Sequence, residues 1–437
     1  MTRAVPGVPV SAPGRVDVAA LALYLSRPSL VLGVYPASSR VETGPDERGP
    51  ADARELGERL AEAVRRAVGP HRTVAVLHDG SLGATALLAA ADTAGRELGA
   101  EVAVVVADHP DPRGASVAVP AQQAIALLGG RHRFLLAEAD RLPGRGSWDR
   151  TPQEEGRGGR DGWNPVAPDL ARTPLVRAAE ARAEQLGATV ILTADGCEEL
   201  LQAGPSGLTD VRAAGRGLAD RWQAEGVAAA LADAAAALGR GPAARRLRAR
   251  LHLAQAPFAR VLGGPPRVLA PELRAHVEAW TAGWVGRLAE DLAGERDPVR
   301  ACVRARMARF AGPHPAAVAA AAPVPRAAPF LDPGFAAWAP RLPQSARYDA
   351  RRPTPHLRRN RLLISLVPRA ARDALPATPP PPASGELPGA AGEYPLCREL
   401  GLLAPGEDAP AEVRTRLTVL EEWLSGYGRV SPDRNGG

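Results

Sequence analysis

The chain has 437 residues, enough for two domains and a large hydrophobic core. Its 45% hydrophobic and 23% charged residues are ordinary for a globular protein. The formal net charge is +6, but the basic residues are interspersed with Asp and Glu and aromatic residues are only 4%, so we expect no nucleic-acid partner. No window approaches the roughly 20 apolar residues of a membrane helix, and no signal-peptide core is visible, so we expect a cytoplasmic protein without a membrane partner.

The basic and sulfur-bearing residues narrow the chemistry. The chain contains no Lys, so all 54 basic residues are Arg. Cys197, Cys302 and Cys397 are far apart in the sequence and form no CxxC pair. We therefore expect neither a zinc site nor a disulfide framework.

Short apolar runs alternate with helical patterns in the first half of the chain. Residues 51–68 are the clearest helix, because four apolar residues fall on one stripe: Leu56, Leu60, Val64 and Val68. Alternating strands and helices predict a parallel, doubly wound sheet. We expect strands over 73–77, 101–107, 133–136 and 189–193, and helices over 85–98, 120–128 and 173–186.

Two strands end in polar loops. Residues 74–85, VAVLHDGSLGAT, read as strand, Gly-bearing loop and helix, and the backbone N–H groups of such a loop favour an anion. Residues 189–201, TVILTADGCEELL, read as a strand that enters an acidic loop. Both loops are expected at the carboxyl ends of strands, where such sheets bind ligands. A strand–loop–helix unit that binds nothing stays an alternative.

Strands fade after residue 205, and a helical lobe packed on the sheet is the simplest interpretation. We expect helices over 226–238, 271–293 and 297–310, and a long loop without periodicity over 141–172. Three histidines lie far apart and are expected to have ordinary structural roles: His252, His276 and His314.

Together the two loops resemble the paired motifs SGGLDSS and GDGGDE of the asparagine synthetase-like ATP-pyrophosphatase family. Residues 204–222 are similar to the stretch after the second motif in lasso peptide cyclases, a branch of this family. APFLDPGF at 328–335 resembles the family's PFLD segment. LCRELGLL at 396–403 and LEEWL at 420–424 resemble the cyclase C-terminal signature, so the resemblance spans roughly residues 15–425. Lasso peptide cyclases and β-lactam synthetase-type amide ligases are the nearest branches.

The resemblance implies an asparagine synthetase C-terminal domain-like fold, which is adenine nucleotide α-hydrolase-like, with an α-helical lobe. It implies a remnant of the connector to a glutaminase domain, an α/β core, a helical lobe, and a Pro-rich linker with a C-terminal helix, over 1–50, 51–204, 205–375 and 376–437. The glutaminase would need a Cys where Thr2 follows Met1, so we expect no ammonia from glutamine within this chain, and synthesis of free asparagine is disfavoured.

The resemblance also implies a site. Family members use ATP and Mg²⁺ to adenylate a carboxylate, which an amine then attacks. Matched residue by residue, the nucleotide-binding positions are Asp79, Gly80, Ser81, Thr85, Asp195 and Gly196. Glu198 takes the place of a metal-binding Asp, and Glu199 matches the family's Glu. Arg361, in HLRRNRLLISLVP at 356–368, is the cation nearest the family's catalytic Lys.

Several positions depart from the family pattern. Asp79 replaces the first Ser of the first motif, and Gly83 occupies the column of a magnesium-binding Asp. The Lys is absent, and Arg stays protonated, so Arg361 cannot exchange a proton as a Lys can. A Pro-rich segment at 376–394 replaces an expected basic loop.

Two hypotheses follow. The chain is a lasso cyclase-like amide ligase that acts on a peptide or small-molecule carboxylate, with Asp79, Glu198 and Arg361 taking over the lost roles. Alternatively, it is a catalytically degenerate relative that binds a peptide or serves as a partner subunit of another biosynthetic enzyme.

Overall fold

The computed structural model describes residues 18–26, 51–108, 116, 118–129, 132–138, 174–203, 219, 222, 241–255, 264–308, 324–375, 377–378 and 393–430. Several predictions lie outside these residues: the 141–172 loop, nearly all of 204–222, the 226–238 helix, His314, and most of 1–50 and 376–394. No helix in the described part of the chain is long and apolar enough to span a bilayer.

Five parallel strands form one sheet, in the order β3-β2-β1-β4-β5. They are β1 (Thr73–His78), β2 (Glu101–Asp108), β3 (Phe134–Glu138), β4 (Val190–Leu192) and β5 (Arg326–Ala327). The inner strands are rich in Val and Ala and buried along most of their length, as strands covered on both faces must be. The four predicted strands and their parallel arrangement are confirmed. β5 was not predicted, because two residues are too short to show a strand pattern.

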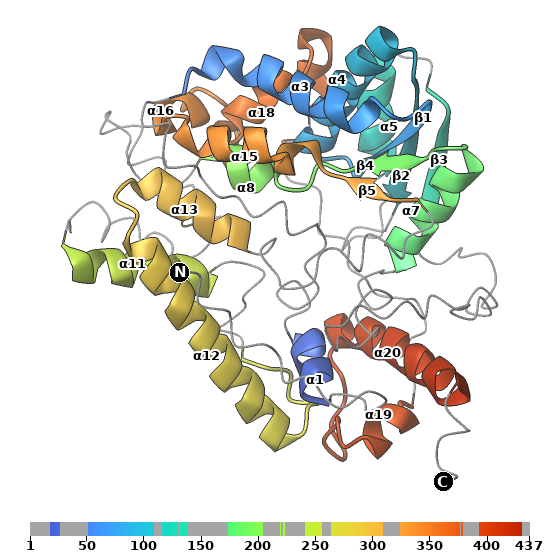
Figure 1. Ribbon diagram of the computed structural model, residues 1–437, viewed down its shortest axis with the longest axis vertical. Coiled ribbons are helices and arrows are strands. Elements are labelled where there is room, and N and C mark those ends of the chain that lie inside the picture. Colours follow the sequence, from blue (N-terminus) through green and yellow to red (C-terminus); the bar gives the residue numbers. More distant parts are fainter. Residues whose placement is uncertain are drawn as a thin grey trace.

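Helices cover both faces of the sheet (Figure 1), as predicted for a doubly wound arrangement. On one face lie α3 (Leu56–Val68), preceded by the 3₁₀ turn η2 (Ala53–Glu55), α4 (Leu82–Leu98) and α5 (Ala118–Leu127). The opposite face carries α7 (Pro174–Gln185). Alternation along the strands explains the division, because Val74 and Val76 join the first core and Ala75 joins the second. The predicted stripe of α3 is fully buried.

Residues 326–375 pack onto the first of these faces. The segment consists of η6 (Pro329–Leu331), α15 (Pro333–Trp338), η7 (Ala339–Arg341), α16 (Gln344–Arg347), α17 (Pro355–Arg359), α18 (Arg361–Leu366) and η8 (Arg369–Ala374). Phe330, Phe335 and Leu363 share a core with α3 and α4, and the Phe330 and Phe335 rings meet edge to face at 5.7 Å. The domain boundaries at 204 and 375 stay predictions, but this segment belongs to the hydrophobic core of the sheet.

Between residues 241 and 308 the described part of the chain forms the helices α11 (Pro242–Gln255), α12 (Pro271–Ala293) and α13 (Pro298–Met307). The bounds of α12 are those predicted. α13 begins one residue later than predicted, because the Asp297 carboxylate caps its first turn by accepting from the N–H groups of Val299 and Arg300.

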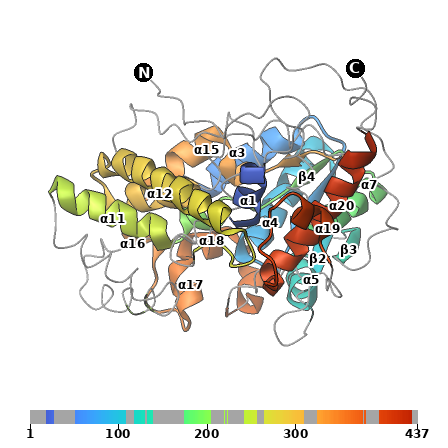
Figure 2. The ribbon, with the colours of Figure 1, turned by 90° about the horizontal axis from the view of Figure 1, so that it is seen from below.

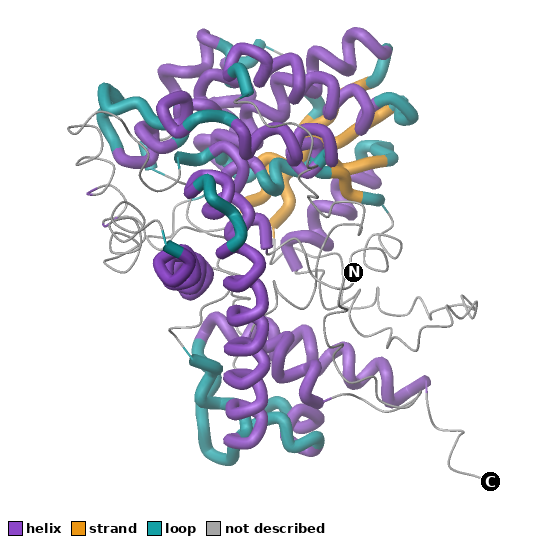
Figure 3. The backbone as a smooth tube through the Cα atoms, turned by 60° about the vertical axis from the view of Figure 1, so that its left-hand side comes forward, coloured by secondary structure: helices purple, strands orange, loops and turns teal. Residues whose placement is uncertain are grey.

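A further core, separate from the two on the faces of the sheet, lies at the far end of α12 from α13 (Figures 1 and 2). It joins α1 (Val18–Ser26), the start of α12, α19 (Pro395–Glu399) and α20 (Ala411–Val430). The Glu421 carboxylate holds α19 against α20 by accepting from the backbone N–H groups of Leu396 and Cys397. In Figure 3 the strands gather at one end of the molecule, away from the helices of this core. Leu269 and Leu403 add an isolated antiparallel bridge to the core.

Candidate functional site

The two predicted loops lie side by side. β1 pairs with β2 on one side and with β4 on the other, so the strand order reverses between β1 and β4. Val76 of β1 is in register with Leu192 of β4, and both strands then run into their polar loops. In open α/β sheets, ligands bind outside the carboxyl ends of the strands at such a switch point.

His78 fixes the shape of the first loop. Gly80, which has a φ of 80°, donates its N–H to His78 Nδ1 at 3.1 Å. His78 Nε2 must then carry the proton, and it lies 3.3 Å from Thr85 Oγ1, which donates to the Ser81 carbonyl at 2.9 Å. Burial lowers the pKa of His78 to about 4, against a smaller opposing effect of Asp79. A neutral His78 therefore ties the end of β1 to the first turn of α4.

The first loop uses most of its own donors. Ser81 caps α4 by accepting the Ala84 N–H at 3.1 Å, and the exposed Asp79 accepts the Ser81 N–H at 3.0 Å. With Gly80 bonded to His78, the N–H groups of Leu82 and Gly83 in the first turn of α4 have no acceptor among the described residues. An anion at this helix terminus would find two donors and a neighbouring carboxylate.

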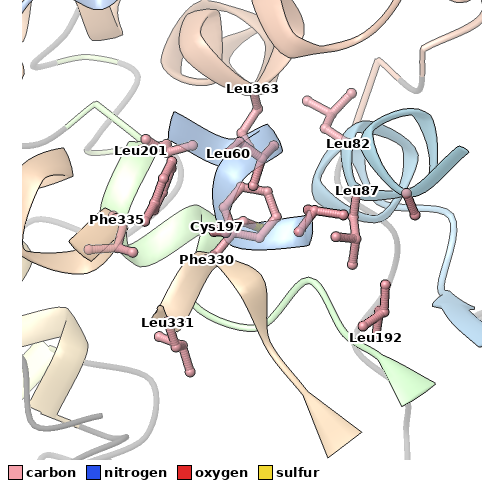
Figure 4. Packing of buried hydrophobic residues seen from close by; sticks show 14 of the residues in the cluster. Leu60, Leu82, Leu87, Leu192, Cys197, Leu201, Phe330, Leu331, Phe335 and Leu363 are labelled. Carbon is pink, nitrogen blue, oxygen red and sulfur yellow. The ribbon is translucent and has the colours of Figure 1, made fainter. Parts of the chain in front are cut away.

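Gly83 and Gly196 bring three segments into direct contact. Figure 4 shows Leu82, Cys197 and Phe330, one residue from each segment, in the same hydrophobic core. A Cβ on Gly83 would lie 2.2 Å from Cys197 Sγ, so the buried Cys197 fills the space that a side chain at position 83 would take. A Cβ on Gly196, whose φ is 86°, would lie 2.3 Å from Leu331 Cδ2 in the PFLD segment. The first loop, the second loop and the PFLD segment therefore pack without space for larger side chains.

Four carboxylates act on the Cys197 thiol through their charge. Burial raises the pKa of the Cys197 thiol, and the charges of Glu198, Glu199, Asp79 and Asp195 raise it further. The structure thus brings together three of the predicted site residues, Asp79, Asp195 and Glu198, with Glu199 beside them. The two glutamates lie in the first turn of α8 (Cys197–Leu201), where negative charge is favoured.

The carboxylate oxygens of these acids are ligands of a kind that magnesium accepts, but they are too few to bind the ion alone. No group of three or more His, Cys, Asp or Glu residues in the described ranges could by itself hold a metal ion. Magnesium is usually bound through one or two carboxylates together with substrate phosphates and water, rather than in an all-protein cage. The described acids of this cluster therefore form no site for the free ion by themselves, and magnesium bound here would also need ligands from a nucleotide or water.

Three arginines hold the other end of α8, and no sequence pattern predicted them. Arg347 is fully buried and donates to the carbonyls of Leu200, Ala339 and Leu342. Arg306 of α13 donates to the Gln202 and Ala203 carbonyls at 3.2 and 3.3 Å, and Arg359 donates to the Gln202 side chain at 3.0 Å. Burial, and next the charge of Arg306, lower the pKa of Arg347 to about 9. This arginine cluster fixes the helix that presents the acids.

His356 lies beside this cluster. Burial, and next the positive charge of Arg359, lower the pKa of His356 to about 4. Its Nδ1 lies 3.2 Å from Asn360 Nδ2, so the ring is neutral and oriented by the next turn of the chain. His252 and His276 are not part of the acidic cluster.

Arg361 and Asp332 have other partners. Arg361, at the first residue of α18, is exposed and donates to the Ser345 carbonyl at 3.1 Å, and none of its contacts is with the acidic cluster. Asp332 of the PFLD segment caps α15 and pairs with Arg66 of α3 at 2.8 Å. The structure therefore does not bring the predicted catalytic cation together with the acids.

Searches for relatives leave the two loops without a match. No protein-family model matches the chain, and no curated protein matches its sequence. The geometry of the β1 and β4 loops, with the residues that they present, is therefore the basis for any functional proposal.

Proposed function

We propose that the chain is an asparagine synthetase-like amide ligase that acts in the biosynthesis of a peptide natural product. One observation carries the proposal: the two loops that resemble the family's motifs leave the adjacent strands β1 and β4 where the strand order reverses. This is the position at which α/β sheets bind nucleotides. The fold would then be of the asparagine synthetase C-terminal, adenine nucleotide α-hydrolase-like kind.

The reaction has two steps. A carboxylate oxygen attacks the α-phosphorus of ATP, and the bond to pyrophosphate breaks. An amine nitrogen then attacks the acyl carbon, AMP leaves with the oxygen, and the nitrogen loses a proton to form the amide. The substrate would be a peptide or small-molecule carboxylate, and the unpaired Cys197, Cys302 and Cys397 suit a reducing cytoplasm.

The residues at the two loops would bind different parts of the nucleotide complex. The N–H groups of Leu82 and Gly83 at the start of α4 would face a phosphate. Asp195 and Glu198 would bind the magnesium that accompanies it. Arg361 makes no contact with these acids among the described residues, so a role for it as the cation in place of the missing Lys stays a hypothesis.

A second candidate is supported by the first loop itself. Gly80, Ser81 and Ala84 donate to side chains of the loop, and Asp79 would repel a phosphate. Cys197 fills the space that a side chain at position 83 would take. These features favour a catalytically degenerate relative that binds a peptide or partners an active enzyme.

Calorimetric titration of ATP, with and without Mg²⁺, tests the nucleotide site. We expect magnesium-dependent binding that Asp195→Ala and Glu198→Ala abolish. Glu290→Ala is the matched control, because Glu290 is an exposed carboxylate on α12 that pairs only with Arg246. No binding at millimolar ATP would contradict the ligase and leave the degenerate relative.

Asp79→Ala separates the two candidates more sharply. If Asp79 contributes to a metal-bound phosphate site, its loss weakens magnesium-dependent ATP binding. If Asp79 only blocks the loop, its loss frees the Ser81 N–H, removes a repelling charge, and strengthens ATP binding without magnesium.

A further inference from the structure

Asp108 lies at the carboxyl end of β2, next to the first loop. His78, the last residue of β1, is in register with Val106, so Asp108 lies two residues beyond it on the neighbouring strand. Side chains alternate along a strand, and Val104 and Val106 belong to the core shared with α4 and α5. The Asp108 carboxylate is therefore on the α4 side of the sheet, at the edge where the first loop begins.

One carboxylate oxygen of Asp108 is engaged and the other is available. Oδ1 accepts from Ser116 Oγ at 2.7 Å and from the Ala118 N–H at 3.3 Å, which caps α5. Oδ2 has no hydrogen-bond partner among the residues that the structure describes. The side chain is half-buried, so its orientation is fixed while one acceptor is presented at the sheet edge.

We infer that Asp108 Oδ2 accepts a hydrogen bond from a ribose hydroxyl of bound ATP, an inference that rests on the proposed function. In the Rossmann dinucleotide-binding fold, whose phosphate loop also follows the first strand, an acidic residue farther along the chain accepts from a ribose hydroxyl. An ionised carboxylate only accepts hydrogen bonds, and a ribose hydroxyl donates one. Asp108 would therefore select ribonucleotides over deoxyribonucleotides.

Calorimetry with ATP, 2′-deoxy-ATP and 3′-deoxy-ATP, each with Mg²⁺, tests this role. We expect ATP to bind about tenfold more tightly than at least one deoxynucleotide, the usual effect of one hydrogen bond to a charged group. Asp108→Asn should reduce this preference to about threefold, because its oxygen stays with the two donors at Oδ1 and its NH₂ replaces Oδ2, so the hydroxyl keeps at most a weaker hydrogen bond to a neutral group.

Asp297→Asn is the matched control. Asp297 also caps a ten-residue helix, α13, through its Oδ1, so this substitution reproduces the loss of charge at a helix cap. It should leave the ribose preference unchanged. ATP binding without a ribose preference, or a preference that Asp108→Asn leaves intact, would overturn the role of Asp108 while sparing the proposed function. Failure of the native chain to bind any of the three nucleotides would overturn both.

Discussion

Gly83 lies against the side chains of Cys197 and Ala194, and Cys197 makes the closer approach. In Gly83→Ala the new Cβ would lie 2.2 Å from Cys197 Sγ, so we expect the free energy of unfolding to fall by about 1–3 kcal/mol. Cys197→Ala removes that sulfur. The double variant should therefore lose less free energy of unfolding than the sum of the losses in the two single variants. Denaturant unfolding of the four proteins measures this coupling.

Gly57 provides the control for that cycle. It also lies in a helix, α3, but no atom is within 4 Å of an added Cβ. Gly57→Ala should therefore be neutral, or stabilising by up to about 1 kcal/mol. Strictly additive effects of Gly83→Ala and Cys197→Ala would contradict the contact between the two loops.

His78 and His356 make the stability of the fold sensitive to acid. Burial lowers both pKa values from 6.5 to about 4, so between these values the unfolded chain binds a proton that the folded chain excludes. Their contribution to stability is complete above pH 6.5 and is lost as the pH falls toward 4. The loss should approach about 1.4 kcal/mol per pH unit for each group within this window.

Asparagine at both positions should flatten this dependence. In His78→Asn the amide oxygen can still accept the Gly80 N–H, and the side chain no longer titrates. The free energy of unfolding is measured by urea denaturation at several pH values, so a uniform loss of stability does not affect the slope. An unchanged slope in the double variant would exclude the two histidines as its source.

At the scale of elements, α8 depends on a buried guanidinium. Arg347→Lys keeps the charge but cannot reach the carbonyls of Leu200, Ala339 and Leu342 together, since only the planar fork of Arg spans them. We expect a loss of about 2 kcal/mol or more in the free energy of unfolding, because buried carbonyls lose their donors.

Arg361→Lys is the matched substitution on an exposed site. Arg361 makes one contact, with the Ser345 carbonyl, so stability should change by less than about 0.5 kcal/mol. The variant also places a Lys at the position nearest to that of the catalytic Lys in the proposed asparagine synthetase-like family. Equal thermal stability losses in the two variants would contradict the structural role of Arg347.

At the scale of the whole molecule, two hydrophobic cores are separate. Leu87 is fully buried in the core of the sheet, and Leu417 is fully buried in the core of α1, α12, α19 and α20. Each Leu→Ala substitution should cost about 2–5 kcal/mol locally. Hydrogen exchange should show lost protection over 73–108 for the first, and over 18–26 and 395–430 for the second. If each variant lost protection equally over all of these segments, the two cores would instead unfold as one cooperative unit.

Hydrophobic periodicity in the sequence determined much of the fold. Runs of Val and Ala mark four of the five strands, and the apolar stripe of α3 marks a helix, because burial against a neighbouring layer requires these periods. The same patterns placed Asp79 and Asp195 at the ends of strands. Since parallel strands end at one edge, their proximity followed from the chain order.

Tertiary packing decided what local patterns cannot encode. β5 is a strand only because β4 offers it a hydrogen-bonded edge, and Gly83 must be a glycine only because Cys197 lies against it. Arg347 is buried because carbonyls from distant segments converge on its guanidinium. Each property depends on a partner far away in the sequence, whereas the sequence by itself determines only the periodicity that a local segment needs to be buried.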